Sequence, residues 1–289
     1  MKKVVTRFAP SPTGRLHLGH AYSAVLAHDL ARSRGGMFLL RIEDIDPGRA
    51  RPEHIDGVIE DLVWLGLMPD GEIVYQSERL PLYAKALDRL KRQGLVYPCF
   101  CTRGDIAREI AASASAPHGP DGPVYPGTCR RLAPDERARK MQALPHAWRL
   151  DAAKASAAAG PLHWRDGETD VPAEPQRFGD VVLARKDAPT SYHLAVTVDD
   201  AAQGVTDIVR GHDLYEATHV HRLLQTLLDL PSPRYHHHPV LLDAEGRRLA
   251  KRNGAPSIAG LRLAGADPRK LVADLLAGTL PSGYSAASA

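Results

Sequence analysis

The stretch RFAPSPTGRLHLGH, residues 7–20, decides how the rest of the chain is interpreted. It follows the short apolar segment KVVTRFA, which predicts a buried strand, and it leads into an apolar segment with helical spacing. A loop between a strand and a helix of an α/β sheet lies at the carboxyl edge of the sheet, where ligands bind. The helix that follows offers free backbone N–H groups and the positive end of its dipole, and both suit a phosphate.

The residues of this loop favour a nucleotide site. Gly19 lets the backbone approach a ligand closely, and His17 and His20 are donors that can reach phosphoryl oxygens. The stretch contains no lysine of the Walker type. The alternative for an isolated H-x-G-H pattern is a proline-rich turn with two surface histidines.

The segments around the loop predict an α/β domain. Apolar residues at helical spacing predict a helix over residues 19–34, and an apolar strand follows at residues 37–44. Further helices are expected from Pro52 and from about Leu80. Alternation of strand and helix is typical of a parallel sheet covered by helices.

The pattern changes at about residue 98. Residues 99–189 have few long apolar periods and many Pro, Gly and Ala residues, which predicts a separate α+β insert. Strand-like segments return at residues 191–200 and 205–211, so one α/β domain is interrupted and then resumed. The expected divisions are the first half of the α/β domain (1–98), the insert (99–189), the second half (190–243), a loop with C-terminal helices (244–278) and a disordered tail (279–289).

The composition is that of an ordinary globular protein, since 44% of the 289 residues are hydrophobic and 25% are charged. No apolar run is long enough to span a bilayer, and the N-terminus lacks the apolar core of a signal peptide. We therefore expect a cytoplasmic protein with no membrane partner. Separately, we expect a monomer. The net charge of +3 permits nucleic-acid binding but does not by itself indicate it.

Two short motifs resemble the signatures of class I aminoacyl-tRNA synthetases. HLGH resembles the HIGH signature, and RLAKR, residues 248–252, resembles the KMSKS signature. RFAPSPTGRLHLGH and LRIEDIDPGRARPE are similar to the opening blocks of glutamyl-tRNA synthetases, and this likeness runs from about residue 4 to residue 278. Because the chain stops soon after RLAKR, we expect no anticodon-binding domain. This layout resembles the glutamyl-Q tRNA(Asp) synthetases, a family that activates L-glutamate with ATP and attaches it to queuosine in the anticodon loop of tRNA(Asp).

The resemblance implies a Rossmann-type catalytic domain and roles for individual residues. Arg248 stands where the family has the first lysine of KMSKS, and Ala250 stands where it has the serine. Lys251 is expected to meet the charge of the transition state, with His17 and His20 along the ATP phosphates. The implied ATP-binding residues are His17, Gly19, His20, Arg248 and Lys251. The implied L-glutamate-binding residues are Arg7, Ala9, Ser11, Glu43, Tyr192 and Arg210.

The chemistry of glutamate divides these residues into two groups. Arg210, with Arg7 and Tyr192, is assigned to the side-chain carboxylate, and Glu43 is assigned to the ammonium group. Mg²⁺ is expected to arrive with ATP, because the phosphates can supply most of its ligands. Without the resemblance, Arg210 and Glu43 could form an ordinary ion pair, and RLAKR could be a basic surface loop.

All three cysteines lie in the insert, as CFC at Cys99 and Cys101 and then Cys129. This spacing is typical of a tetrahedral zinc site that lacks one ligand. The resemblance supplies Tyr125 as the fourth ligand, and ligand chemistry alone leaves His118 as a rival. The zinc ion would be structural, and the alternative is three reduced cysteines without a metal.

Two other functions are compatible with the same residues. One is a minimal glutamyl-tRNA synthetase that charges a tRNA 3′ end, and the other is a non-catalytic RNA-binding paralogue. In the parent family the insert contacts the tRNA acceptor end, and basic residues of this insert suit either phosphates or a solvated face. These residues are Arg103, Arg130, Arg131, Arg137, Arg139 and Lys140.

Overall fold

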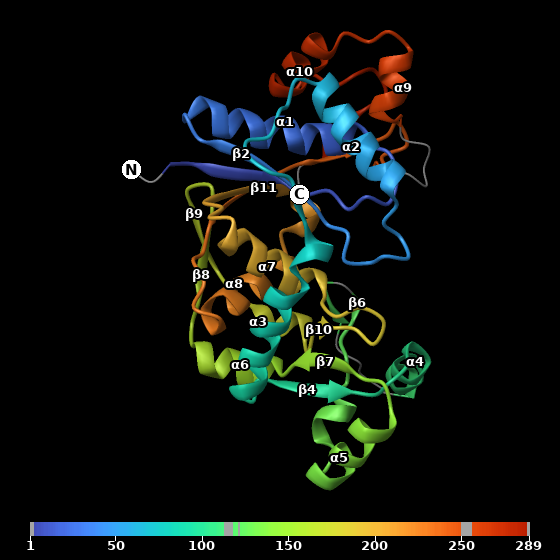
Figure 1. Ribbon diagram of the computed structural model, residues 1–289, viewed down its shortest axis with the longest axis vertical. Coiled ribbons are helices and arrows are strands. Elements are labelled where there is room, and N and C mark those ends of the chain that lie inside the picture. The colour runs from blue at the N-terminus through green and yellow to red at the C-terminus, as the bar shows by residue number, and fades with distance from the viewer. Residues whose placement is uncertain (1–2, 113–117, 121, 250–255, 288–289) are drawn as a thin grey trace.

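A parallel sheet forms the centre of the upper half of the molecule in Figure 1. The computed structural model describes residues 3–112, 118–120, 122–249 and 256–287. The strands across the sheet are β3 (Val74–Tyr75), β2 (Met37–Ile42), β1 (Val5–Phe8), β11 (Asp207–Gly211) and β12 (Arg234–His238). β1 adjoins β11, where the amide of Thr206 donates to the carbonyl of Val5 at 2.9 Å. The β1–β2–β3 sheet from the first half of the α/β domain and the β11–β12 strands from its second half therefore continue into one another.

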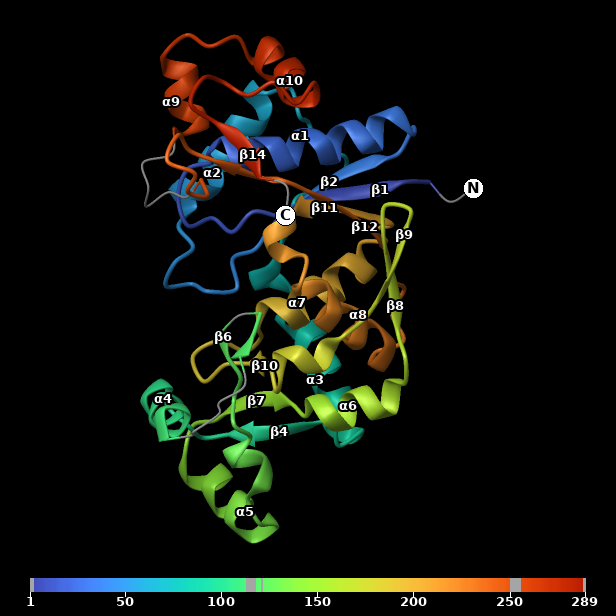
Figure 2. The same ribbon diagram turned by 180° about the vertical axis from the view of Figure 1, so that it is seen from behind.

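Helices cover both faces of this sheet (Figures 1 and 2). On one side lie α1 (Leu18–Ser33), α2 (Pro52–Trp64), α9 (Ile258–Leu263) and α10 (Pro268–Leu276). On the other side lie α3 (Leu80–Arg92), α7 (Tyr192–Ala202) and α8 (Ala217–Leu227). The buried face of α1 includes Ala21, Ala24, Ala27 and Ala31, and these small side chains let the helix pack close to the sheet.

The lower half of the molecule contains a second, antiparallel sheet, whose strands run in the order β10, β7, β4. Its strands are β4 (Val96–Cys99), β7 (Ala147–Leu150) and β10 (Val182–Ala184), and nearby lie α4 (Arg103–Ala112), α5 (Pro134–Ala143) and α6 (Ala152–Ala159). Leu150 and Leu183 of this sheet belong to the same apolar cluster as Leu90 of α3 and Leu224 of α8. The insert thus shares a core with helices of the α/β domain.

The remaining elements are short. The two-residue strands are β5 (His118–Gly119) and β6 (Gly122–Pro123), and the 3₁₀ helices are η1 (Gln76–Arg79), η2 (Thr128–Arg131), η3 (Pro175–Phe178) and η4 (His212–Leu214). None of the helices in the described residues combines the length and the apolar character needed to cross a membrane.

One hairpin that we assigned to the insert extends the central sheet instead. β8 (His163–Asp166) pairs in parallel with β12 and in antiparallel fashion with β9 (Thr169–Pro172). Figure 2 shows this hairpin beside β11 and β12. Trp164 of β8 is buried with Tyr235 of β12 and Ile208 of β11, which anchors the hairpin to the sheet.

Two further sequence predictions are wrong. Residues 191–200 were expected to be a strand, but they lie in α7 and its N-terminal flank. This helix is buried on several sides, from Leu194 to Asp200, so its apolar run imitates that of a buried strand. The tail was expected to be disordered, but Ser285–Ala287 forms β14, which pairs with β13 (Val240–Leu242). The edge of β13 offers backbone groups that the tail can pair with.

Candidate active site

The HLGH segment forms a capping box at the start of α1. The amide of Gly19 donates to Nδ1 of His17 at 3.1 Å, and the amide of His17 donates to Nδ1 of His20 at 3.1 Å. Because each Nδ1 accepts a hydrogen bond, each neutral ring carries its proton on Nε2. The two rings lie 3.7 Å apart, centroid to centroid. The sequence therefore places two imidazole donors at the positive end of a helix, as a phosphate site requires.

Gly19 leaves room for the ring of His17. A Cβ atom at this position would lie 3.1 Å from Cε1 and 3.2 Å from Nδ1 of His17. These distances are shorter than an ordinary van der Waals contact, so any larger residue would press on the ring. The absence of a side chain at Gly19 thus allows the ring of His17, two positions earlier, to keep its orientation.

The C-terminal flank of the RLAKR segment lies against the HLGH segment, and the first residue of RLAKR pairs with η4. Ser257 forms an isolated antiparallel bridge with His17, and the amide of Ile258 donates to the carbonyl of Leu16 at 2.8 Å. Arg248 Nη2 lies 2.6 Å from Asp213 Oδ2. Lys251 lies outside the described residues, between Arg248 and Ser257.

A buried ionic network lies at the carboxyl ends of β1 and β2. Arg7 Nε donates to Asp200 Oδ1 at 3.1 Å, and Arg41 Nη1 donates to the same oxygen at 2.8 Å. Arg41 Nη2 also lies 3.3 Å from Glu43 Oε1. Burial raises the pKa of the Asp200 carboxyl, but Arg7 and Arg41 outweigh it and hold that pKa below its usual value. For Glu43, burial prevails over the two arginines and raises the pKa of the carboxyl.

Arg210 has no such counter-charge. It is only 4% exposed, and in the part of the chain that the structure describes no carboxylate forms an ion pair with it. Its guanidinium donates to Nε2 of His237 (3.1 Å), Oη of Tyr192 (3.4 Å), Nδ1 of His221 (3.4 Å) and Oγ1 of Thr218 (2.5 Å). A buried cation with only neutral partners is costly unless a ligand supplies the negative charge.

A cavity of about 230 Å³ brings together three of the residues implied for glutamate, namely Ser11, Glu43 and Tyr192. Arg7, Ala9 and Arg210 are not among the residues that line it. Arg210 nevertheless reaches Tyr192, which stands at the wall of the cavity. Burial raises the pKa of the Tyr192 hydroxyl, so this group remains a proton donor at neutral pH.

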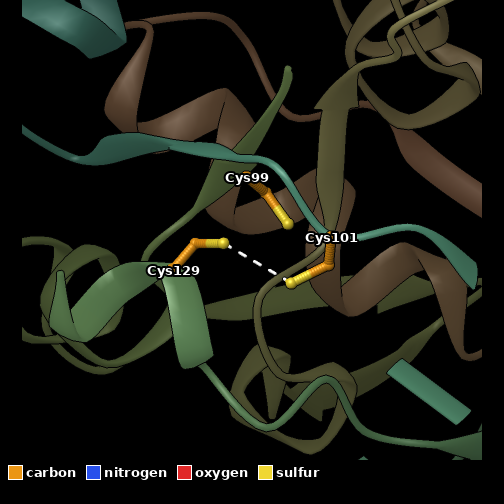
Figure 3. Close-up of side chains that lie close together, drawn as sticks. All are labelled: Cys99, Cys101 and Cys129. Carbon is orange, nitrogen blue, oxygen red and sulfur yellow. Dashed lines mark hydrogen bonds between the residues drawn. The ribbon is translucent and has the colours of Figure 1, made fainter. Parts of the chain in front are cut away.

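The three cysteines converge with Tyr125, as Figure 3 shows for the sulfur atoms. The three Sγ atoms lie within 4.8 Å of one another, and Cys101 Sγ is 3.5 Å from Cys129 Sγ. Tyr125 Oη is 3.4 Å from Cys99 Sγ and 3.5 Å from Cys101 Sγ. Donors of a tetrahedral zinc site stand roughly 3.5–4 Å apart, and the Cys101–Cys129 distance and the two distances from Tyr125 are close to this spacing. The side chain of His118, the rival ligand, lies outside the described part of the chain.

Several basic residues of the insert make contacts within the molecule. Arg130 Nη1 lies 3.1 Å from Asp180 Oδ2, and Arg137 donates to the carbonyl of Arg130 at 3.0 Å. Lys140 Nζ lies 2.8 Å from Glu136 Oε1 on the same helix. Arg130 and Arg137 thus connect separate segments of the insert, whereas the Lys140 pair is exposed and lies within one helix.

Comparison with known proteins places the chain in a family. The family model for the catalytic domain of class I tRNA synthetases (E and Q) matches residues 3–279. The chain belongs to this family. A glutamyl-Q tRNA(Asp) synthetase of Rhodobacter capsulatus is 53% identical over 278 residues, which cover 92% of this chain and 97% of that protein. A glutamyl-Q tRNA(Asp) synthetase of Deinococcus radiodurans is 46% identical over 96% of this chain and 89% of its own length.

A solved structure is similar as well. It is a glutamate tRNA ligase from Elizabethkingia meningosepticum in complex with its amino acid, with 27% identity and a TM-score of 0.74. The match covers 88% of this synthetase-family chain and 53% of the ligase, so this chain spans about half the length of that protein.

Sequence reasoning missed two charged residues of this synthetase-family site, Arg41 and Asp200. Arg41 is fully buried near the carboxyl end of the apolar strand MFLLRI, and Asp200 follows Asp199 near the end of α7. A charge inside an apolar strand is a signal of a buried partner, because an unpaired charge would be too costly there. The partner itself could not be identified from the sequence, since Asp200 lies 159 positions away from Arg41.

Proposed function

We propose that this chain is a glutamyl-Q tRNA(Asp) synthetase, which activates L-glutamate with ATP and transfers it to queuosine in tRNA(Asp). The names of its relatives support the reaction, and one observation supports the amino acid. Arg210 is a buried guanidinium without a carboxylate partner among the described residues. A site of this kind favours a ligand with a side-chain carboxylate.

Glutamate would bind between the two charged regions of the site. Arg210 and Tyr192 donate to the side-chain carboxylate, and Arg7 adds positive charge, although it already pairs with Asp200. Glu43 accepts from the ammonium group. Ala9 and Ser11 belong to the loop that follows β1 and complete the proposed pocket.

ATP would lie along the HLGH segment. His17 and His20 donate from Nε2 to phosphoryl oxygens, with Gly19 at the start of α1. Arg248 and Lys251 bring further positive charge from the RLAKR segment, and Mg²⁺ enters with the triphosphate. These groups stabilise the charge that develops as the phosphoryl group is transferred.

The reaction has two steps. An oxygen of the α-carboxylate of glutamate attacks the α-phosphorus of ATP, and pyrophosphate leaves with the electrons of the broken bond. A hydroxyl of the queuosine ring then attacks the carbonyl carbon of the adenylate, loses its proton, and releases AMP. Neither step needs a nucleophile from the protein, so catalysis rests on positioning and charge stabilisation.

Zinc would have a structural role. Cys99, Cys101, Cys129 and Tyr125 offer three sulfurs and one oxygen at distances that fit a tetrahedral ion. When bound, the ion would hold the loop after β4 against η2. No step of the reaction involves it.

ATP–pyrophosphate exchange without tRNA tests the first step. We expect exchange that depends on glutamate and is weak with aspartate or glutamine. Arg210→Gln should lose at least 100-fold in kcat/KM for glutamate. Arg234→Gln, an exposed arginine on the neighbouring strand, is the matched control and should change little. Absence of exchange would support the non-catalytic paralogue and contradict the proposal.

Transfer of radiolabelled glutamate tests the acceptor. We expect labelling of tRNA(Asp) that contains queuosine, and none of tRNA(Asp) that lacks it. Labelling of tRNA(Glu) alone, at its 3′ end, would identify a minimal glutamyl-tRNA synthetase instead.

A further inference from the structure

A chain of hydrogen bonds leads from Arg210 to the hairpin that extends the central sheet. Arg210 Nε donates to His237 Nε2 at 3.1 Å, and His237 Nδ1 lies 3.0 Å from Asp166 Oδ1. The same carboxylate oxygen accepts from the backbone amide of His237 at 3.1 Å. Asp166 ends β8, and His237 stands on β12 next to β11, so three neighbouring strands carry the three residues (Figure 2).

The hydrogen bonds of this series all run in one direction, with Arg210 as the first donor and Asp166 as the last acceptor. The guanidinium of Arg210 has only protons to donate, so Nε2 of His237 must be without a proton. Nδ1 of His237 must then carry the proton, and the carboxylate of Asp166 accepts it. The side chain of His237 is fully buried, and burial, followed by Arg210, lowers its pKa to about 2. The ring is therefore neutral and present as one tautomer.

A second series of hydrogen bonds also begins with Arg210 as the donor. Arg210 Nη1 donates to Nδ1 of His221, and Nε2 of His221 lies 3.2 Å from Nδ1 of His193. His221 is buried and His193 is partly buried, and desolvation lowers the pKa of both rings, that of His193 to about 4. The two imidazoles that contact the guanidinium, those of His237 and His221, are thus neutral and do not cancel its charge. Carboxylates in their place would compete with the ligand for the same cation.

We propose that Asp166 and His237 are positioning residues that aim Arg210 at the side-chain carboxylate of the amino-acid substrate. This inference rests on the proposed function, because it takes glutamate as the ligand of Arg210. Without Asp166, the Nδ1 proton of His237 would be buried without its acceptor, and only the donation from Arg210 to Nε2 would favour this tautomer. A ring that moves its proton to Nε2 presents a donor to Arg210 Nε, and the guanidinium must turn away.

The exchange assay with single variants tests this inference. Asp166→Ala should raise KM for glutamate roughly 10- to 100-fold, as expected when a buried donor loses its partner. KM for ATP and kcat should change by less than about threefold, because the phosphate site is separate. Asp166→Asn should restore most of the loss. Its oxygen is held towards the amide of His237, so it still accepts from Nδ1.

Two further variants separate positioning from folding. His237→Phe keeps the ring that contacts Trp164 and Tyr235 but offers Arg210 no acceptor, and it should match Asp166→Ala. Asp170→Ala removes an exposed Asp–His pair from the same hairpin, since Asp170 contacts His163, and it should behave as wild type. Thermal melting of each variant shows whether the hairpin remains folded.

The outcomes distinguish this inference from the proposed function. Wild-type exchange that depends on glutamate, together with an unchanged KM in Asp166→Ala and His237→Phe, would overturn the inference alone. Equal losses in Asp166→Asn and Asp166→Ala would also overturn it, because acceptance by the oxygen would then not matter. Wild-type protein without glutamate-dependent exchange would overturn both.

Discussion

Replacing Asp61 with asparagine should change how the stability of the protein depends on pH. Asp61 is fully buried on α2, and its carboxylate forms no ion pair with the described residues. The backbone amide of Leu16 only partly offsets the effect of burial on this carboxyl. Burial raises the pKa of this carboxyl from 3.8 to about 6, against the opposing effect of Arg262 and Arg15. The buried carboxylate thus destabilises the folded chain when it is ionised.

The size and sign of the effect follow from these two pKa values. A carboxyl with a higher pKa in the folded chain stabilises that chain in acid, and this contribution is lost as pH rises through about 6. The difference between 3.8 and about 6 corresponds to about 3 kcal/mol at roughly 1.4 kcal/mol for each pH unit. At pH 7 the wild type should therefore be about 3 kcal/mol less stable than it would be with a neutral group of the same size.

Urea denaturation at a series of pH values measures this quantity. The free energy of unfolding of Asp61→Asn minus that of the wild type should increase by about 2 kcal/mol between pH 4 and pH 7. The gain is below 3 because the unfolded chain is already partly ionised at pH 4. Glu60→Gln is the matched control on the same helix, since Glu60 is half exposed and pairs with Arg15 and Arg262. Parallel stability curves for wild type and Asp61→Asn would refute the reasoning.

Three further predictions concern the site. Gly19→Ala should lower kcat for exchange roughly tenfold or more and leave KM for glutamate nearly unchanged, because its Cβ would press on His17. An unchanged kcat would show that the ring can move without loss. Burial raises the pKa of the Glu43 carboxyl. As the pH is lowered, KM for L-glutamate should therefore begin to rise at a higher pH than it would if Glu43 had the pKa of an exposed glutamate side chain. In Glu43→Gln, KM for L-glutamate should be high and should not change with pH. If KM of this variant still rose in acid, Glu43 would not be the group that binds the ammonium. Metal analysis should find one zinc ion per chain. Cys129→Ala should contain no zinc and should melt at a lower temperature than the wild type. Tyr125→Phe should bind zinc more weakly than the wild type. Full zinc occupancy in Cys129→Ala would contradict the site.

The local elements near the N-terminus could be predicted from the sequence because they depend on local patterns. A helix over residues 19–34 was expected, and α1 runs from Leu18 to Ser33. A strand over residues 37–44 was expected, and β2 runs from Met37 to Ile42. Here the apolar spacing, glycine and proline signals agree with the tertiary structure.

The errors arise where distant parts of the chain decide the structure. Residues 163–172 have the composition of the insert, yet they pair with β12, which lies about 70 positions further along the chain. Nothing local distinguishes this hairpin from the other short strands of the insert. The Asp166–His237 pair was missed for the same reason, since it exists only because β8 joins the sheet.

The candidate site could be approached from the sequence only through the resemblance. That resemblance selected Arg7, Glu43 and Arg210 as single residues, but it said nothing about how their charges are balanced. The balance depends on Arg41 and Asp200, which contact each other across 159 positions. Lys251 remains a prediction, because it lies outside the described residues.

The three buried arginines of this site differ in a way that indicates the charge of the ligand. Arg7 and Arg41 share the carboxylate of Asp200, so the fold itself compensates them. Arg210 donates hydrogen bonds only to neutral groups among the described residues, although a carboxylate is present on a neighbouring strand. Asp166 is kept one imidazole away from it, where it can orient the guanidinium without neutralising it. A protein that needed Arg210 only for stability would gain by direct pairing with that carboxylate. The intervening histidine therefore supports the proposal that the positive charge of Arg210 is kept for an anionic ligand.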